Sequence, residues 1–313
     1  RKPLMATPTT TAELDAPVKP TTFQPVSLRR KAVNHMATVL VTASVLIALI
    51  PLVWVLVSVF VKGIGVVTNT TWWTHSQAGM TAFAAGGGAY HAIVGTLLQG
   101  LVCAAISIPI GVFVGIYLVE YGAGTRLGKL TTFMVDILTG VPSIVAALFI
   151  YALWVATLGF GRSGLAVSLS LVLLMVPVIV RSTEEMLRIV PMDLREAAYA
   201  LGVPKWKTIV RIVIPTALSG IVTGIVLALA RVMGETAPLL VLVGYAQAMN
   251  FDMFTGFMGS LPGMMYDQTS AGAGANPIPT DRLWGAALTL IVLIALLNIG
   301  ARFLAKLFAP KKV

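Results

Sequence analysis

The run ATVLVTASVLIALIPLVWVLVSVFV, residues 37–61, is 25 residues long and contains no charged side chain. A helix rises about 1.5 Å per residue, so about 20 apolar residues cross the ~30 Å hydrocarbon core of a bilayer. The run is therefore long enough to cross a membrane as one helix. Of the 313 residues of the chain, 57% are hydrophobic and only 11% are charged, whereas a soluble domain carries roughly 25% charged residues. We predict an all-α integral membrane protein.

Further apolar stretches follow at residues 90–119, 130–156, 165–180, 216–243 and 283–301. The stretch 165–180 is the shortest. Pro142 and Pro177 fall inside the third and fourth spans, where they are expected to kink the helix, a distortion that bundles with water-filled cavities tolerate. The sequence thus predicts six transmembrane helices in one bundle.

Two pairs of glycines repeat at a spacing of four residues inside predicted spans. They are Gly111 with Gly115 and Gly220 with Gly224. Small residues at this spacing let two helix backbones approach closely. We interpret both pairs as sites of close helix packing rather than of ligand contact.

Lys and Arg residues decide the orientation of the spans, since cytoplasmic loops carry an excess of positive charge. With the N-terminus in the cytoplasm, the inner side holds Arg1, Lys2, Lys19, Arg29, Arg30, Lys31, Arg126, Lys129, Arg181, Arg188, Arg195, Lys205, Lys207, Arg211, Arg302, Lys306, Lys311 and Lys312. The outer side receives only Lys62, Arg162 and Arg282, and Arg231 lies within a span. Both termini are therefore predicted to be cytoplasmic, in a plasma membrane. This placement explains the net charge of +10 without a nucleic-acid partner.

The parts outside the spans differ in character. Residues 1–28 are rich in Pro and Thr and poor in apolar side chains, which predicts a disordered cytoplasmic tail before a transmembrane domain at 29–313. Residues 245–281 predict a long, mobile outer loop. The single cysteine, Cys103, cannot form a disulfide framework or a zinc site, and the three histidines show no ligand spacing, so no metal site is predicted.

The loop at residues 181–215 is the polar exception among the inner segments. Ser182 with Glu185 fits a capping box that starts a short helix, which Pro191 ends. Asp193 suits the N-cap of a second helix over 194–201. A merely solvated basic loop would explain the charges of this segment but not these helix signals.

The second half of that loop contains further signals for the end and the start of a helix. Gly202 is expected to close the second helix in the left-handed conformation. Pro204 suits the first turn of a third helix that leads into the fifth span. We predict a compact helix–turn–helix that projects from the membrane, with Ala197 and Ala198 forming one smooth face for a partner.

The sequence EAAYALGVPKWKTIVRIVIP, residues 196–215, resembles the EAA loop of type I ABC-importer permeases. The matching positions are Glu196, Ala197, Ala198, Gly202, Ile212, Ile214 and Pro215, with Ile214 where the family more often has Leu. By resemblance, the helix around residues 196–201 is a cytoplasmic coupling helix that docks into a groove of a separate ATPase subunit. Glu196, Ala197, Ala198 and Gly202 are accordingly the predicted coupling residues.

Residues 122–130, GAGTRLGKL, superficially resemble a nucleotide-binding loop. A Walker A motif needs four residues between its glycines and Ser or Thr after the Lys. Here Ala123 stands where the first glycine is needed, and Leu130 follows Lys129. We therefore predict no ATPase and no cofactor on this chain, with ATP and Mg²⁺ bound by the partner ATPase.

Two opposite charges lie inside the fifth span, in LALARVMGETAPLLVLVG at residues 227–244. Each intramembrane charge costs about 2.5–3.5 kcal/mol on insertion scales, so Arg231 and Glu235 indicate function. A spacing of four places them on one helical face, where they can partly neutralise each other. Pro238 is expected to weaken the helix one turn later.

Two interpretations of this pair remain open from the residues alone. In one, the face lines a polar path, because a guanidinium offers a flat fork of donors that suits a tetrahedral oxyanion. Glu235 would then hold Arg231 while the anion is elsewhere, which makes a transient site. In the other, the pair is a buried ion pair that locks helices together.

The stretch ALARVMGETAPLL, residues 228–240, resembles the signature of phosphate importer permeases of the Pst type, in which an Arg precedes Gly-Glu-Thr. Ala237, Pro238 and Leu239 after Thr236 favour the A-type subunit over its partner permease. DILTGVPSIVAALF, from Asp136 to Phe149, also resembles that family, and the resemblance covers about residues 90–308. It implies a heterodimer with a second, homologous permease, two ATPase subunits and an extracytoplasmic phosphate-binding protein.

The predicted substrate path thus consists of Arg231, Glu235, Thr236 and Asp136, with inorganic phosphate as the substrate. Asp136 is the weakest member, because its place near the inner end of the third span also fits a carboxylate at the level of the lipid headgroups. The alternative functions are an ABC importer for another oxyanion such as sulfate or molybdate, an ion-coupled secondary transporter with Glu235 as proton carrier, and a scaffold that recruits the ATPase without transporting.

Overall fold

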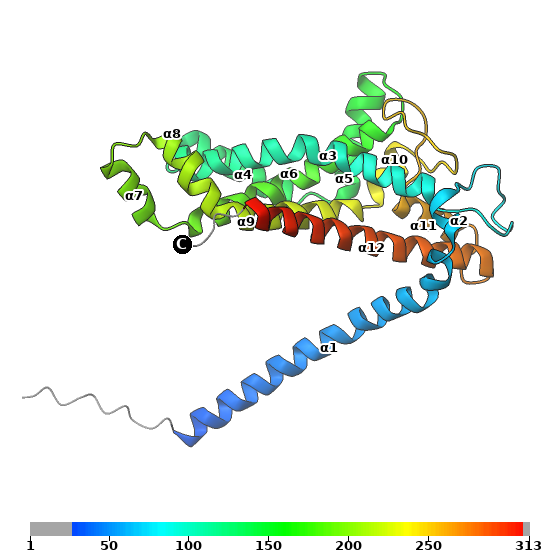
Figure 1. Ribbon diagram of the computed structural model, residues 1–313, viewed down its shortest axis with the longest axis horizontal. Helices are drawn as coiled ribbons and strands as arrows, with labels where there is room; N and C mark the ends of the chain where they lie inside the picture. Colours follow the sequence, from blue (N-terminus) through cyan, green and yellow to red (C-terminus); the bar gives the residue numbers. More distant parts are fainter. Residues whose placement is uncertain (1–26, 309–313) are drawn as a thin grey trace, which may run out of the picture. The chain divides into compact units, whose positions relative to one another are not determined.

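The computed structural model describes residues 27–308, and these residues are predominantly helical (Figure 1). The helices are α1 (Leu28–Val67), α2 (Thr70–Thr74), α3 (Tyr90–Ile116), α4 (Arg126–Thr139), α5 (Ser143–Ile150), α6 (Gly164–Ile189), α7 (Met192–Ala200), α8 (Lys205–Thr208), α9 (Ile214–Met233), α10 (Ala237–Leu242), α11 (Leu261–Ser270) and α12 (Pro277–Phe308). Three π-helical segments continue neighbouring helices, at Tyr117–Tyr121, Tyr151–Thr157 and Ile209–Val213.

The chain divides into two compact units at Val55 and Leu56, inside α1. In the N-terminal unit the described residues belong almost entirely to α1, and their apolar side chains are exposed. The predicted tail, 1–28, lies outside the described residues except for Ser27 and Leu28, and Leu28 already begins α1. An apolar helix of this kind is stable in hydrocarbon rather than in water.

In the second unit, α6 packs against both α3 and α9. A Cβ on Gly111 of α3 would lie 2.6 Å from Cγ2 of Ile179. A Cβ on Gly224 of α9 would lie 1.7 Å from Oγ of Ser182. Real Cβ atoms do not approach other atoms so closely, so glycine is required at both contacts. The prediction that the glycine pairs mark close helix packing is confirmed.

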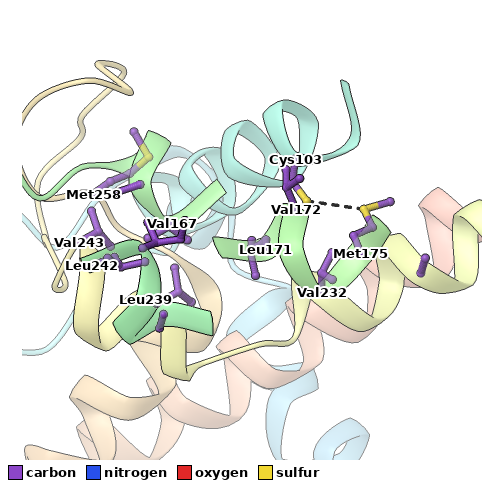
Figure 2. Close-up of a cluster of buried hydrophobic side chains, with 14 of the residues drawn as sticks. Cys103, Val167, Leu171, Val172, Met175, Val232, Leu239, Leu242, Val243 and Met258 are labelled. Atoms are coloured by element: carbon purple, nitrogen blue, oxygen red, sulfur yellow. Dashed lines mark hydrogen bonds between the residues drawn. The ribbon is translucent and has the colours of Figure 1, made fainter. Parts of the chain in front are cut away.

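The apolar core lies around α6, as Figure 2 shows. Val167, Leu171 and Met175 of α6 are all less than 5% exposed. Cys103 of α3 is fully buried beside Met175, with 3.6 Å between the two sulfur atoms. α6 is therefore the central helix of this unit.

Five helices are long and apolar enough to cross a membrane, or six if one bent pair counts as a single span. That pair consists of α4 with α5 and its π-helical extension, which bend by 106°. The predicted third span, 130–156, is therefore not one kinked helix. Pro142 is the N-cap of α5, and its fixed φ and missing N–H stop the preceding helix.

The prediction that a separate short helix starts at Ser182 is wrong. α6 continues without a break to Ile189. Ser182 caps no helix, and its buried hydroxyl has no hydrogen-bond partner among the described residues. The capping-box pattern was misleading because Ser182 lies in the middle of a helix, where it fits against Gly224.

The predicted mobile loop at 245–281 contains a buried helix instead. Ser260 is the N-cap of α11 and accepts a hydrogen bond from the Gly263 N–H at 3.2 Å. Pro262 occupies the first turn of α11, a position at which a proline costs no helix hydrogen bond. α12 then begins at Pro277, earlier than the predicted sixth span. Within the second unit, α7 lies at one end and α2 and α11 at the other (Figure 1).

Candidate substrate path and coupling helix

The predicted fifth span is interrupted between Met233 and Ala237. α9 ends at Met233, and Gly234 caps it. α10 begins at Ala237, with Pro238 in its first turn. In a continuous helix the ring of Pro238 would clash with the carbonyl of Gly234, four residues earlier. The break therefore lies one turn before Pro238, whereas the sequence predicted that the helix weakens at Pro238, one turn after the charged pair. Figure 2 shows Val232 and Leu239 on the two sides of this break.

Arg231 and Glu235 lie on different sides of the end of α9. Arg231 belongs to the last turn of the helix and is exposed, whereas Glu235 lies in the break and is half-buried. Between residues 27 and 308, no ion pair or hydrogen bond joins the two side chains. The prediction that they share one helical face is wrong, because the helix ends between them. Among the described residues, Arg231 and Glu235 therefore do not form the buried ion pair of the second interpretation.

The exposed face of α9 that carries Arg231 also carries hydroxyl groups. Thr216, Ser219 and Leu227 are exposed on this face at helical spacing, and Thr223 between them is half-buried. The Thr216 and Thr223 hydroxyls donate to carbonyls one turn earlier, at 2.6 and 2.8 Å. Their oxygens remain available on the surface of the helix.

Glu235 lines a small cavity between α3, α6, α9, α10 and the start of α11. The polar groups around it come from Glu235, Gln99, Thr96 and Ser260, and the cavity has room for about one water molecule. Gln99 is 2% exposed, and its Nε2 has no hydrogen-bond partner among the described residues. An unpaired buried amide costs about 1–3 kcal/mol, so Gln99 is a candidate donor to a group in this cavity.

The other polar groups at this cavity are already used in holding the structure together. The Thr96 hydroxyl accepts a hydrogen bond from the Leu261 N–H at 2.8 Å and donates to the Ala92 carbonyl at 2.8 Å. Ser260 caps α11. Among the described residues that line this cavity with Glu235, Gln99 is the one whose side-chain N–H group has no hydrogen-bond partner. Thr236 lies half-buried directly before α10, with no side-chain capping bond.

Asp136 pairs with Arg181 of α6, not with Arg231. Arg181 also donates to Glu184 at 2.6 Å, and Arg188 donates to the other oxygen of the same carboxylate at 2.6 Å. Glu184 is buried, while the Asp136 side chain is 59% exposed. Arg181 thus connects α4 to α6, while its pair with Glu184 and the Arg188–Glu184 pair lie within α6.

The predicted coupling helix is α7, nine residues long, and only two of its residues are buried: Arg195 and Ala198. Glu196 and Ala197 are exposed. The prediction that Ala197 and Ala198 form one smooth outer face is wrong, because successive residues of a helix point about 100° apart and Ala198 packs inward. Asp193 is not the N-cap either, since the cap is Pro191 and Asp193 lies in the first turn.

The turn after α7 follows the sequence prediction. Gly202 has φ +74°, the left-handed conformation expected after a helix end. Its N–H donates to the Tyr199 carbonyl at 2.9 Å, and the Val203 N–H donates to the Ala198 carbonyl at 3.0 Å. Pro204 then precedes α8 as its N-cap. These bonds fix the angle at which α7 projects.

Sequence reasoning missed two functional candidates. Gln99 gave a weak signal as a polar residue inside an apolar span, where polar side chains are often functional. In the sequence Arg195 is one positive charge among several in a cytoplasmic loop, yet in the structure it is 6% exposed and pairs with buried Glu120. The partners are 75 residues apart in the sequence, so no local pattern links them.

A model of the family described as "Binding-protein-dependent transport system inner membrane component" matches residues 107–313. The chain is 55% identical over 302 residues to phosphate transport system permease protein PstA 1 of Mycobacterium tuberculosis (strain CDC 1551 / Oshkosh), covering 95% of this chain and 98% of the relative. It is 56% identical to PstA of Mycobacterium leprae (strain TN), covering 93% and 94%. With PstA of Yersinia pestis the identity is 40%, covering 90% and 92%.

Solved structures share the fold at low sequence identity. A bacterial alginate ABC transporter, solved with an alginate pentasaccharide-bound periplasmic protein, matches with a TM-score of 0.62 and 13% identity, covering 91% of this chain and 99% of that chain. The inward-facing MetNI methionine ABC transporter matches with a TM-score of 0.54 and 19% identity, covering 70% and 93%. The arrangement of helices is thus that of an ABC-importer permease.

Proposed function

The chain belongs to the binding-protein-dependent transport system inner membrane components, and from this premise we propose how its residues serve transport. It is a phosphate transport permease of the PstA type, the transmembrane part of an ATP-driven importer. The relatives' names support phosphate over sulfate or molybdate. Ion-coupled transport with Glu235 as proton carrier has no comparable support.

We propose that the exposed face of α9 lines this subunit's half of the phosphate path. The observation that carries the proposal is Arg231, the one charged side chain of α9, which is exposed in the last turn and does not pair with Glu235. A guanidinium can donate two parallel hydrogen bonds to oxygens of a tetrahedral anion. The hydroxyls of Thr216, Ser219 and Thr223 continue the same face with weaker, neutral contacts.

Glu235 and Thr236 complete the proposed site at the break in the helix. Glu235 carries a negative charge that disfavours a resident anion, which keeps binding transient. The Gln99 amide beside it can donate to the Glu235 carboxylate, directly or through one water, when the anion occupies Arg231. Asp136, held by Arg181, stays a prediction as a path residue; a role in fastening α4 to α6 is the simpler account.

Energy for import reaches this chain, in our proposal, through α7. The exposed Glu196 and Ala197 contact a separate ATPase subunit, while the inward-packed Ala198 and the turn at Gly202 hold the helix in place. The chain itself is then non-catalytic, and ATP and Mg²⁺ bind to the partner. A second homologous permease, two ATPase subunits and an extracytoplasmic phosphate-binding protein complete the assembly.

The proposed orientation follows from the same assignment. If α7 meets an ATPase, its end of the bundle is cytoplasmic, and α2 and α11 lie at the extracytoplasmic end of a plasma-membrane protein. Cysteines placed one at a time at Leu201 and at Phe254, both exposed, test this in intact cells. A membrane-impermeant maleimide should label the Phe254→Cys protein alone, and labelling at Leu201→Cys would reverse the orientation.

The function is tested by reconstituting the full transporter in vesicles with phosphate-loaded binding protein outside. ATP-dependent accumulation of labelled phosphate is expected, with sulfate and molybdate failing to compete. Competition by either anion at equal concentration would favour the broader oxyanion transporter. Accumulation that persists without the ATPase, driven by a proton gradient, would favour the secondary transporter.

A further inference from the structure

We infer that the ion pair between Arg195 and Glu120 is the joint through which movement of α7 reaches the ends of α3 and α6. The inference deepens the proposed function, because it rests on α7 being the element that meets the ATPase. We call Arg195, Glu120 and the carbonyls of Leu187 and Val190 the Arg195 anchor.

The guanidinium of Arg195 bonds three acceptors from two different parts of the bundle. Its Nη2 donates to Oε1 of Glu120 at 3.0 Å and to the Leu187 carbonyl at 3.0 Å. Its Nη1 donates to the Val190 carbonyl at 2.7 Å. Leu187 belongs to the last turn of α6, and Glu120 lies in the π-helical segment that ends α3. One side chain of α7 thus holds both helix ends.

The anchor is buried, which makes its two charges act as a unit. The side chains of Arg195 and Glu120 are 7% and 5% exposed. A buried charge that loses its partner is strongly unfavourable, since no water takes the partner's place. Any displacement of Arg195 therefore draws Glu120 with it or leaves two buried charges unpaired.

Besides its chain connection to α6, α7 packs against α8 and the π-helical segment Ile209–Val213, but few of its side chains are buried. Arg195 and Ala198 are its only buried residues, and they lie three positions apart on one face. Met192, Tyr199 and Leu201 around them are exposed. A force applied to α7 by a partner thus has the Arg195 anchor as its main polar route into the bundle.

A second cation, Lys205, also contacts the π-helical segment that contains Glu120. The Lys205 ammonium, at the start of α8, donates to the Glu120 carbonyl and lies 4.7 Å from the centre of the Tyr121 ring. The helices on both sides of the turn at Gly202 are therefore bound to the same short segment of α3. The segment that contains Glu120 is thus bonded both by Arg195 of α7 and by Lys205 of α8.

α3 can carry the displacement to the proposed substrate path. It runs as one continuous helical segment from Tyr90 to Tyr121, and Gln99 on it lines the cavity that Glu235 completes. At 1.5 Å per residue, the distance along the helix from Glu120 to Gln99 is about 30 Å. The last carbonyls of α6 offer a parallel route, since Leu171 of α6 lines the same cavity.

The test uses the complete transporter in vesicles with phosphate-loaded binding protein, and it measures the phosphate imported per ATP hydrolysed. Glu120→Gln keeps the volume and one acceptor but removes the charge. Arg195→Lys keeps the charge but cannot bond three acceptors at once. In assembled complexes we expect each variant to keep hydrolysing ATP while the phosphate imported per ATP falls by about fivefold or more.

Arg188→Gln is the matched control. It removes a cation from the same end of the bundle, but from an exposed side chain whose pair with Glu184 lies outside the anchor. Its phosphate-to-ATP ratio should equal that of the wild type. A merely structural role for the anchor would lower transport and stimulated hydrolysis together and leave the ratio unchanged.

The outcomes distinguish failure of the anchor from failure of the transport function. If Glu120→Gln does not assemble, Arg195→Lys decides between the two roles of the anchor, because it preserves the buried charge balance. An assembled Arg195→Lys transporter with the wild-type ratio would overturn the inference. A wild-type assembly that imports no phosphate would instead overturn the proposed function itself.

Discussion

Arg231 and Glu235 are four residues apart and unpaired, because α9 ends between them and Glu235 turns toward a cavity that Gln99 also lines. The cation is left exposed on one face of the helix, and the carboxylate is half-buried at the break. The two groups are thus presented to different surroundings. In the proposed function, this separation leaves Arg231 accessible to an anion.

Replacing Arg231 with Gln should reduce phosphate uptake by roughly 10- to 100-fold, the effect of losing a charge-assisted hydrogen bond. Arg231→Lys should recover part of the activity, since it restores the charge but not the planar fork of donors. Uptake is measured in vesicles at several phosphate concentrations. Wild-type uptake by a normally assembled Arg231→Gln transporter would remove Arg231 from the path.

Gln99→Leu should slow phosphate uptake without lowering thermal stability. The leucine removes a buried amide whose Nε2 has no partner among the described residues, so the folded state loses nothing at that nitrogen. Ser170→Ala is the matched control, because Ser170 of α6 is also fully buried, its hydroxyl has no partner among the described residues, and it lies outside the cavity. If both variants transport at the wild-type rate, Gln99 has no part in the path.

Gly202→Ala should weaken the retention of the ATPase by the permease. Gly202 has φ +74°, and an alanine in that conformation costs roughly 1 kcal/mol, so the angle of α7 changes. Gly159→Ala is the control, since Gly159 has φ +73° in a turn at the other end of the bundle. Co-purification of the ATPase should fall only for Gly202→Ala, and equal retention by both would exclude a coupling role for the turn.

Gly95→Ala should destabilise the folded protein by about 2 kcal/mol or more, the cost of forcing a methyl group into a packed core. A Cβ at Gly95 of α3 would lie 1.9 Å from the backbone carbonyl oxygen of Gly259, which no rotamer change can relieve. At Gly65 a Cβ would meet nothing within 4 Å. Thermal unfolding in detergent should therefore show a lower midpoint for Gly95→Ala, with Gly65→Ala unchanged or higher.

Much of the architecture could be predicted from hydropathy, because long apolar helices are visible in the local sequence. The starts of α3 at Tyr90 and of α6 at Gly164 lie within one residue of the predicted spans. The left-handed conformation of Gly202 could also be predicted, because a glycine directly after a helix commonly adopts it.

The errors arose where a local signal competes with tertiary packing. Ser182 and Glu185 have the spacing of a capping box, but Ser182 lies within α6 at its contact with Gly224. Pro238 was expected to weaken the helix one turn after the charged pair, yet its ring would clash with the carbonyl four residues earlier, so the helix already ends at Met233. Ser260 and Pro262 looked like loop residues and instead start α11.

The site could be predicted only in part. Arg231 and Glu235 stand out in any hydropathy scan, but their relative placement depends on where α9 ends. The proposed roles of Gln99 and Arg195 depend on neighbours that are distant in the sequence, such as Glu120 for Arg195. A single sequence holds no information on those distances.

The end of α9 also determines which of the two charged residues can occupy position 231 and which position 235. Peptide dipoles add along a helix, so the last turn presents partial negative charge, which favours a cation there and disfavours an anion. Arg231 occupies that turn, and Glu235 lies just beyond it. Exchanging the two residues would conserve composition and net charge but set a carboxylate against the carbonyl end of a 20-residue helix. The backbone itself therefore assigns the electrostatic polarity of the pair.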